Sequence, residues 1–297
     1  AVGNGAGYNV STGIHNTLIG GVAGDALQTG EANVVIGYNA GGVGDNWSRC
    51  VAVGRAALGN HDPSGTSATV TANVAVGYDA LTTCNTGTNN TAIGYQAGQD
   101  LQGGDNNVFI GLQAGDDTVS GASNVAIGSG ALSANAGNGS VAIGFESAAA
   151  CTTAITAIGY RASKASTVAV ANTAIGNNVL VANVAAQLIT AVGSNVLQTL
   201  NTSSANNYTT AMGYGAGLDA QTASNNTLFG ALAGENITTG GANVLIGRSA
   251  GDNIQTGGSN TLLGYDTAVS AEGSTNQIVI GVSIAGTENN QFSFGKA

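Results

Sequence analysis

Few residues in this sequence are of the types that carry out catalysis or bind metals. The two histidines, His15 and His61, are far apart, and the chain has no HExxH motif, no GxSxG motif and no group of His and Cys residues. Aspartates are scattered, so nothing marks the pair of carboxylates that a glycoside hydrolase holds at a set distance. We therefore expect no catalysis, no metal site and no cofactor.

One stretch combines rare residues that could contact another molecule. Trp47 is the only tryptophan, and it precedes an irregular segment that holds the only proline and the pair His61 and Asp62. Loops on a rigid scaffold carry function more often than the scaffold does. Trp47, His61 and Asp62 are therefore our candidate receptor-contact residues. The alternative is a tolerated insertion with a tryptophan that packs locally.

The three cysteines offer no obvious chemistry. Their number is odd, and Cys50, Cys84 and Cys151 form no CxxC motif. We expect them to be small buried residues.

The element that must position all of these residues is a short repeat. Residues 90–98 read NTAIGYQAG, residues 107–115 read NVFIGLQAG and residues 243–251 read NVLIGRSAG. Aligned on the central glycine, which we call the marker, the copies give 17 markers and 16 intervals, 12 of them 17 residues long. A fixed short period predicts a repeat architecture. The two longest intervals, 23 and 20 residues, predict inserted loops near residues 59–72 and 201–207.

The residues before each marker predict a β-strand. The positions one and three before it are apolar or β-branched, which is strand alternation. We expect these two positions, which include Ile93, Ile110 and Ile246, to face the interior of a coil. The position two before the marker, such as Ala92, points the other way and is also apolar. A strand that is apolar on both faces should be buried on both, so we expect a second copy of the chain to cover that side.

Two further columns predict structural ladders. Asparagine recurs four before the marker, and in coils stacked about 4.8 Å apart such amides can bond to one another and cap the turns. The invariant marker glycine indicates a bend with φ > 0 or a closely approaching backbone. The expected ladder residues are Asn90, Ile93, Gly94, Asn107, Ile110, Gly111, Asn243, Ile246 and Gly247. Tyr or Phe often follows the marker, as a stacking rib or a row that could bind sugar.

Composition excludes several partners. The chain has 297 residues, of which only 7% are charged, and a net charge of −10. Binding nucleic acid by phosphate neutralisation, or an anionic membrane by charge, is therefore disfavoured. No run of 18 apolar residues occurs, so we expect no membrane insertion.

The repeat, written N-[TV]-x-[IV]-G-Y-x-A-G, resembles the shaft repeat of phage tail fibres and tail-fibre-like surface proteins. It also resembles the YadA-like head of trimeric autotransporter adhesins. The stretch from Asn226 to Gly240 is especially similar to the tail-fibre form. The resemblance implies a homotrimer of parallel β-rolls packed about a common axis, extracellular on a virion, that attaches to a host cell-surface glycan or protein. A period of 17 is longer than the usual adhesin head repeat, which favours a tail fibre.

We therefore expect residues 1–297 to form a single all-β rod, a parallel β-solenoid of about 16 coils. Its expected function is the rigid shaft or receptor-binding part of a tail fibre. The first alternative is an adhesin head on a bacterial surface. An ice-binding solenoid needs an exposed rank of threonines, but Thr91, Thr173 and Thr227 fall at a position that we assign to the interior. A glycan-degrading β-helix is the remaining alternative.

Overall fold

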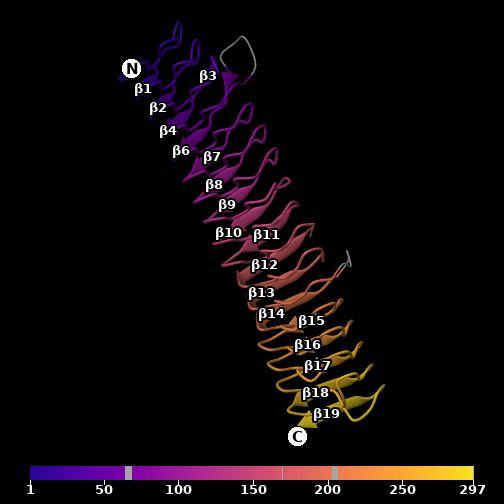
Figure 1. Cartoon of the computed structure of the whole chain (residues 1–297). Helices are drawn as coiled ribbons and strands as arrows, with labels where there is room; N and C mark the ends of the chain where they lie inside the picture. The colour runs from indigo at the N-terminus through magenta and orange to yellow at the C-terminus, as the bar shows by residue number, and fades with distance from the viewer. Residues whose placement is uncertain (64–68, 169, 203–206, 297) are drawn as a thin grey trace. The chain divides into compact units, whose positions relative to one another are not determined.

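The chain folds as a parallel β-solenoid. The structure, a computed structural model, describes residues 1–63, 69–168, 170–202 and 207–296. These residues form two compact units, Ala1–Glu146 and Ser147–Ala297. In each unit the short strands follow one another in chain order (Figure 1). No helix occurs in the described ranges, so none there could cross a membrane.

The first unit contains ten strands, and most are only three residues long. They are β1 (Thr17–Ile19), β2 (Val34–Ile36), β3 (Trp47–Ser48), β4 (Val51–Val53), β5 (Thr69–Val70), β6 (Val74–Val76), β7 (Thr91–Ile93), β8 (Val108–Ile110), β9 (Val125–Ile127) and β10 (Val141–Ile143). Each strand pairs in parallel with the strand one coil away, except that β3 and β5 form a separate two-stranded sheet. The predicted period therefore equals one coil.

The second unit contains nine strands in the same arrangement, including five of five or six residues. They are β11 (Ile155–Ile158), β12 (Asn172–Asn177), β13 (Thr190–Ser194), β14 (Thr210–Tyr214), β15 (Thr227–Phe229), β16 (Val244–Ile246), β17 (Thr261–Leu263), β18 (Ile278–Val282) and β19 (Phe292–Lys296). Marker pairs with marker where the strands extend that far, as Gly176 does with Gly193.

The predicted insertions are only partly described. Gly59 to Pro63 continue the coil, and Thr69 and Val70 form β5, which pairs with β3. Residues 64–68 and 203–206, the centres of the two expected loops, lie outside the described residues.

The prediction of which strand face turns inward is wrong. In β7 the middle residue Ala92 is fully buried, whereas Ile93 is 39% exposed. Ile246 is likewise exposed, and Ile110 is half-buried. The position two before the marker fills the lumen of the coil, and the positions one and three before it point outward. Both faces of the strand are apolar, so hydrophobicity alone does not distinguish them, and the lumen takes the column that exchanges size with the residue four after the marker.

The lumen is packed by a size exchange between two columns of each coil. Where the residue two before the marker is alanine, the residue four after it is often leucine. These pairs are Ala52 with Leu58, Ala75 with Leu81, Ala126 with Leu132, Ala174 with Leu180, and Ala191 with Leu197. Where the first residue is larger, the second is often glycine. These pairs are Leu18 with Gly24, Val35 with Gly41, Phe109 with Gly115, Leu228 with Gly234, and Leu245 with Gly251.

The glycines in this exchange have no room for a side chain. A Cβ on Gly115 would lie 2.6 Å from the ring of Phe109, and a Cβ on Gly251 would lie 2.8 Å from Cδ1 of Leu245. Real Cβ atoms do not approach other atoms so closely, so a large residue in the first of these columns requires a small one beside it.

The marker glycines confirm both parts of their prediction. Gly94 has φ of +139°, and a Cβ there would lie 2.3 Å from the carbonyl oxygen of Gly111 in the next coil. Gly111 and Gly247 have the same conformation and face the same close approach by the next marker. Glycine is therefore needed twice over, for its backbone angle and for its lack of a side chain.

The asparagine ladder is confirmed. The side chain of Asn107 is buried, and its Nδ2 donates to the carbonyl of Gly121 at 2.8 Å and to Oδ1 of Asn90 at 3.0 Å. The backbone N–H of Asn107 also donates to that Oδ1, at 2.9 Å. Asn243 bonds to Asn226 and to the turn in the same way. The amides thus bind each coil to the next and satisfy turn carbonyls that are shielded from water.

Candidate functional site

Trp47 lies inside the coil and not on the surface. Its side chain is 0% exposed, and its indole N–H donates to the carbonyl of Gly44 at 3.2 Å. The indole occupies the space beside Gly41, where a Cβ would lie 2.7 Å from its Cζ2 atom. The indole of Trp47 therefore fills the part of the lumen that Gly41 leaves open. A buried indole has no surface to offer, so the structure gives no support to the prediction that Trp47 contacts a receptor.

His61 is also fully buried, so its assignment as a receptor contact has no support from the structure either. Its ring meets the indole of Trp47 edge-on, at 5.8 Å between centroids. Nδ1 lies 2.6 Å from the carbonyl oxygen of Cys84, and Nε2 lies 2.9 Å from Oγ1 of Thr71. A carbonyl only accepts, so Nδ1 carries the proton and the neutral Nε2 accepts from the Thr71 hydroxyl.

The hydrogen-bond chain from His61 continues to a cysteine. Sγ of Cys50 lies 2.9 Å from Oγ1 of Thr71, whose own proton goes to His61, so the thiol donates to that hydroxyl. Burial lowers the pKa of the His61 imidazole and raises the pKa of the Cys50 thiol. Burial likewise raises the pKa of Cys84 to about 12. Both thiols and the imidazole therefore stay neutral at pH 7, and the cluster is a satisfied polar core.

The remaining predicted residues carry little chemistry. Asp62 is exposed, but its neighbours in the hypothesis, Trp47 and His61, are turned inward. All three cysteines are free and buried, as expected. Within the described ranges, no three His, Cys, Asp or Glu side chains are placed to hold a metal ion.

The first notable surface feature is the outward side of the strands, which we call the outer face. It consists of the residues one and three before each marker, which are Thr, Val, Ile, Leu, Met and Phe in the described strands. Exposed members include Ile19 and Ile93 in the first unit and Met212, Phe229, Ile246 and Leu263 in the second. This apolar, uncharged face was assigned to the interior by the sequence pattern.

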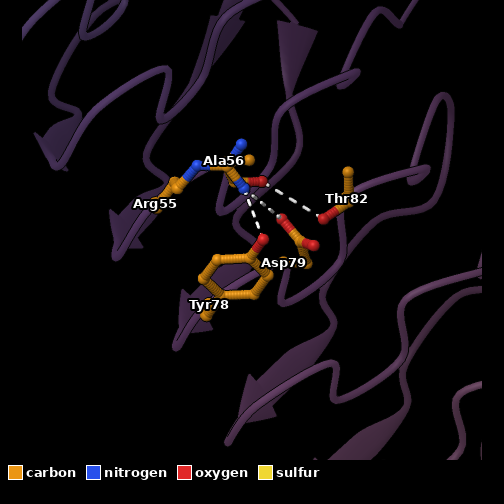
Figure 2. Close-up of polar contacts among 5 residues, drawn as sticks. All are labelled: Arg55, Ala56, Tyr78, Asp79 and Thr82. Atoms are coloured by element: carbon orange, nitrogen blue, oxygen red, sulfur yellow. Dashed lines mark hydrogen bonds and ion pairs between the residues drawn. The ribbon is translucent and has the colours of Figure 1, made fainter.

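The second surface feature is a cluster in the columns that follow the marker (Figure 2). In the first unit, Nη1 of Arg55 donates to the hydroxyl of Tyr78 at 2.6 Å and lies 3.9 Å from a carboxylate oxygen of Asp79. The guanidinium carbon lies 5.0 Å from the centroid of the Tyr78 ring. The neighbouring ring of Tyr95 stacks on Tyr78 at 5.2 Å and 10°, which confirms the predicted aromatic rib at this pair.

The second unit repeats the contact between arginine and tyrosine and the backbone bond between aspartate and arginine. Arg248 lies over the ring of Tyr265, 5.6 Å from its centroid, and Asp266 follows the tyrosine as Asp79 follows Tyr78. In both units the aspartate N–H donates to the arginine carbonyl at 3.0 Å. A sequence signal existed but was missed: Gly-Arg at one marker and Gly-Tyr-Asp at the next occur in both units. We call these two groups the Arg-Tyr-Asp clusters.

Comparison with known proteins adds no relative. No protein-family model matches the chain, and no curated protein and no solved structure is significantly similar to it.

Proposed function

We propose that this protein is a structural fibre protein, the shaft or receptor-binding part of a phage tail fibre. In this proposal three copies pack their outer faces together about a common axis, and the fibre attaches an extracellular particle to its host without catalysis. The number three comes from the resemblance of the repeat to tail-fibre shafts. The same assembly would serve an adhesin head on a bacterial surface, which is the alternative from the same class.

The observation that carries the proposal is the apolar outer face. Parallel sheets are normally covered on both sides, yet here one side of each strand is closed by the lumen and the other lies open. Phe229 is 51% exposed and Ile246 is 37% exposed. Full burial of such a side chain gains about 1.5–3 kcal/mol, so covering the exposed part of each gains about 1 kcal/mol. Summed over the coils of a unit, this is enough to drive association.

Light scattering on the full chain tests the assembly. We expect a mass of three times the 28.7 kDa chain. Ile93→Asp together with Ile246→Asp should lower that mass, because two charges would enter the covered face. Gln113→Glu also adds a charge at an exposed position, but on the turn side of the coil, and should leave the trimer intact. A wild-type monomer would refute the proposal.

A second candidate, an ice-binding face, gains support from the corrected strand orientation. In the second unit five threonines lie in register on successive strands of the outer face: Thr156, Thr173, Thr190, Thr210 and Thr227. The last three are exposed. Threonines at this position therefore face outward and not into the lumen. A thermal-hysteresis assay distinguishes the two candidates. An ice-binding protein must have its outer face free in solution, whereas a fibre shaft must have that face covered.

A further inference from the structure

The Arg-Tyr-Asp clusters are the surface feature that the scaffold itself does not explain. The chain contains four arginines, and three of them lie over a tyrosine ring: Arg55, Arg161 and Arg248. Two of these three belong to the same constellation in separate units. In a chain with only 7% charged residues, such a repetition needs a reason.

We propose that each Arg-Tyr-Asp cluster is a binding subsite for a neutral glycan. The proposal deepens the attachment role above and rests on it, because it names the site and the chemical class of the receptor. It requires only groups that reach solvent. The side chains of Arg55 and Asp79 are 52% and 18% exposed. Arg248, Tyr265 and Asp266 are all exposed.

The chemistry of the cluster fits a polyhydroxylated ligand. A guanidinium offers several N–H donors in one plane, and a carboxylate beside it offers acceptors, so adjacent sugar hydroxyls can both donate and accept. The tyrosine adds an apolar ring with a polar tip. In the first unit the stacked faces of Tyr78 and Tyr95 cover each other, so a sugar would meet ring edges and hydroxyl groups.

The charge of the cluster favours a neutral glycan over other ligands. In the first unit Arg55 and Asp79 are close enough to neutralise each other, so that site has no net charge to attract an acidic polymer. In the second unit Asp252 lies close enough to Asp266 to interact with it, and two carboxylates near Arg248 do not attract an acidic polymer either. The net charge of −10 on the chain repels polyanions as well. A peptide ligand would need apolar pockets for its side chains. The cluster presents a charged and aromatic surface instead.

The first unit extends the site along the stack. Tyr38, Arg55, Tyr78 and Tyr95 follow the marker on four successive strands of the main sheet, β2, β4, β6 and β7, and all four are exposed. Paired strands lie about 4.8 Å apart, so the row could be followed by consecutive sugars of an extended chain. In the second unit the row is shorter, with Arg248 and Tyr265.

Binding of the intact protein to immobilised polysaccharides tests the proposal. The probes are three neutral polymers, mannan, dextran and galactan, with alginate as the acidic comparison. We expect retention on at least one neutral polymer. Arg55→Gln with Arg248→Gln should weaken that retention by roughly tenfold or more, since each change removes a charge-assisted donor. Arg49→Gln is the matched control, because Arg49 is exposed and is not among the three arginines described above over a tyrosine ring.

The outcomes separate this proposal from the proposed assembly. The double arginine variant should keep the oligomeric mass and the melting temperature of the wild type, which a purely structural rib would not allow. Retention on alginate alone, on none of the neutral polymers, or equally by wild type and double variant would each overturn the glycan site. A monomeric wild type that still binds a neutral polymer would overturn the trimer and leave the glycan site standing.

Discussion

Exchanging the large and small residues of one coil tests how the lumen is packed. Leu245 and Gly251 share a coil, and a Cβ on Gly251 would lie 2.8 and 2.9 Å from the two δ-carbons of Leu245. Leu245→Ala alone should cost about 2–5 kcal/mol, because it leaves a cavity. Gly251→Leu alone should cost about 1–3 kcal/mol for overpacking. It also places leucine at φ of +67°, which costs about 1–2 kcal/mol.

The double variant should be far more stable than the sum of the single changes. The new leucine would fill the cavity left by Leu245, and its clash with that residue would be gone. What remains is the backbone cost and a contact with Ile254, whose Cδ1 would lie 3.0 Å from the new Cβ. The same unit already contains the resulting pair, since Ala174 accompanies Leu180, which has φ of +52°. We expect a favourable coupling energy of about 2 kcal/mol or more.

Urea denaturation of the full chain, followed by circular dichroism, measures this cycle. Amide hydrogen exchange in β16 and β17 shows whether the coil opens locally, which matters because repeat proteins need not unfold in one step. Gly139→Leu is the control for backbone strain: its φ is +75°, and no atom lies within 4 Å of the added Cβ. If the double variant loses as much stability as the two single variants together, the size-exchange account is refuted.

Four further outcomes follow from the corrected orientation and from the buried polar groups. Ala92→Asp should unfold its coil, whereas Ile93→Asp should keep the fold and weaken association only; equal melting temperatures for both would contradict the orientation. Asn107→Ala should cost about 1–3 kcal/mol, because buried turn groups lose their partners, and an unchanged melting temperature would argue against the ladder. Burial lowers the pKa of His61, so the stability that the neutral ring contributes to the fold is complete above the unfolded pKa of about 6.5 and is lost as pH falls. His61→Gln should therefore flatten the fall in melting temperature between pH 6.5 and 5. Desolvation and the charges of nearby aspartates raise the pKa of Asp116 to about 6. The stability contributed by its protonated form is complete at low pH and is lost as pH rises through 6. Asp116→Asn should therefore raise the melting temperature at pH 7.5 and have no such effect at pH 4.

The architecture could be predicted from the sequence because the repeat leaves few choices. A period of 17 with a β-branched alternation before each glycine has room for one short strand and its turns. The asparagine ladder followed from the same column alignment, since identical amides one coil apart must meet. Both conclusions depend only on register, which the marker glycines define.

The orientation of the strands could not be read from hydrophobicity, because both faces are apolar. The informative signal is the exchange of size between two columns. The buried residue two before the marker is large where the residue four after the marker is small, as Phe109 is beside Gly115. The outer column that holds Ile93 takes no part in this exchange.

The turns and the candidate site were unpredictable for another reason. Leu81 is buried at φ of +49°, a conformation that the local sequence disfavours and that burial in the lumen compensates. Trp47 looked exposed because it adjoins an insertion, but the space that holds it is created by Gly41 in the same coil. Contacts of this kind form only when the coil closes, so no pattern in the neighbouring sequence predicts them.

The closure of the lumen is also the strongest reason to expect a partner on the outer face. Each described coil fills its interior with its own side chains or with those of the next coil, as Phe109 does beneath Gly98. The interior therefore requires nothing from another chain. The outer face carries apolar side chains and threonines but no charge, although charged residues are available elsewhere on the surface. Stability of the coil alone would be served as well by polar residues there, so the exposed apolar residues of this face are the support for the proposed assembly.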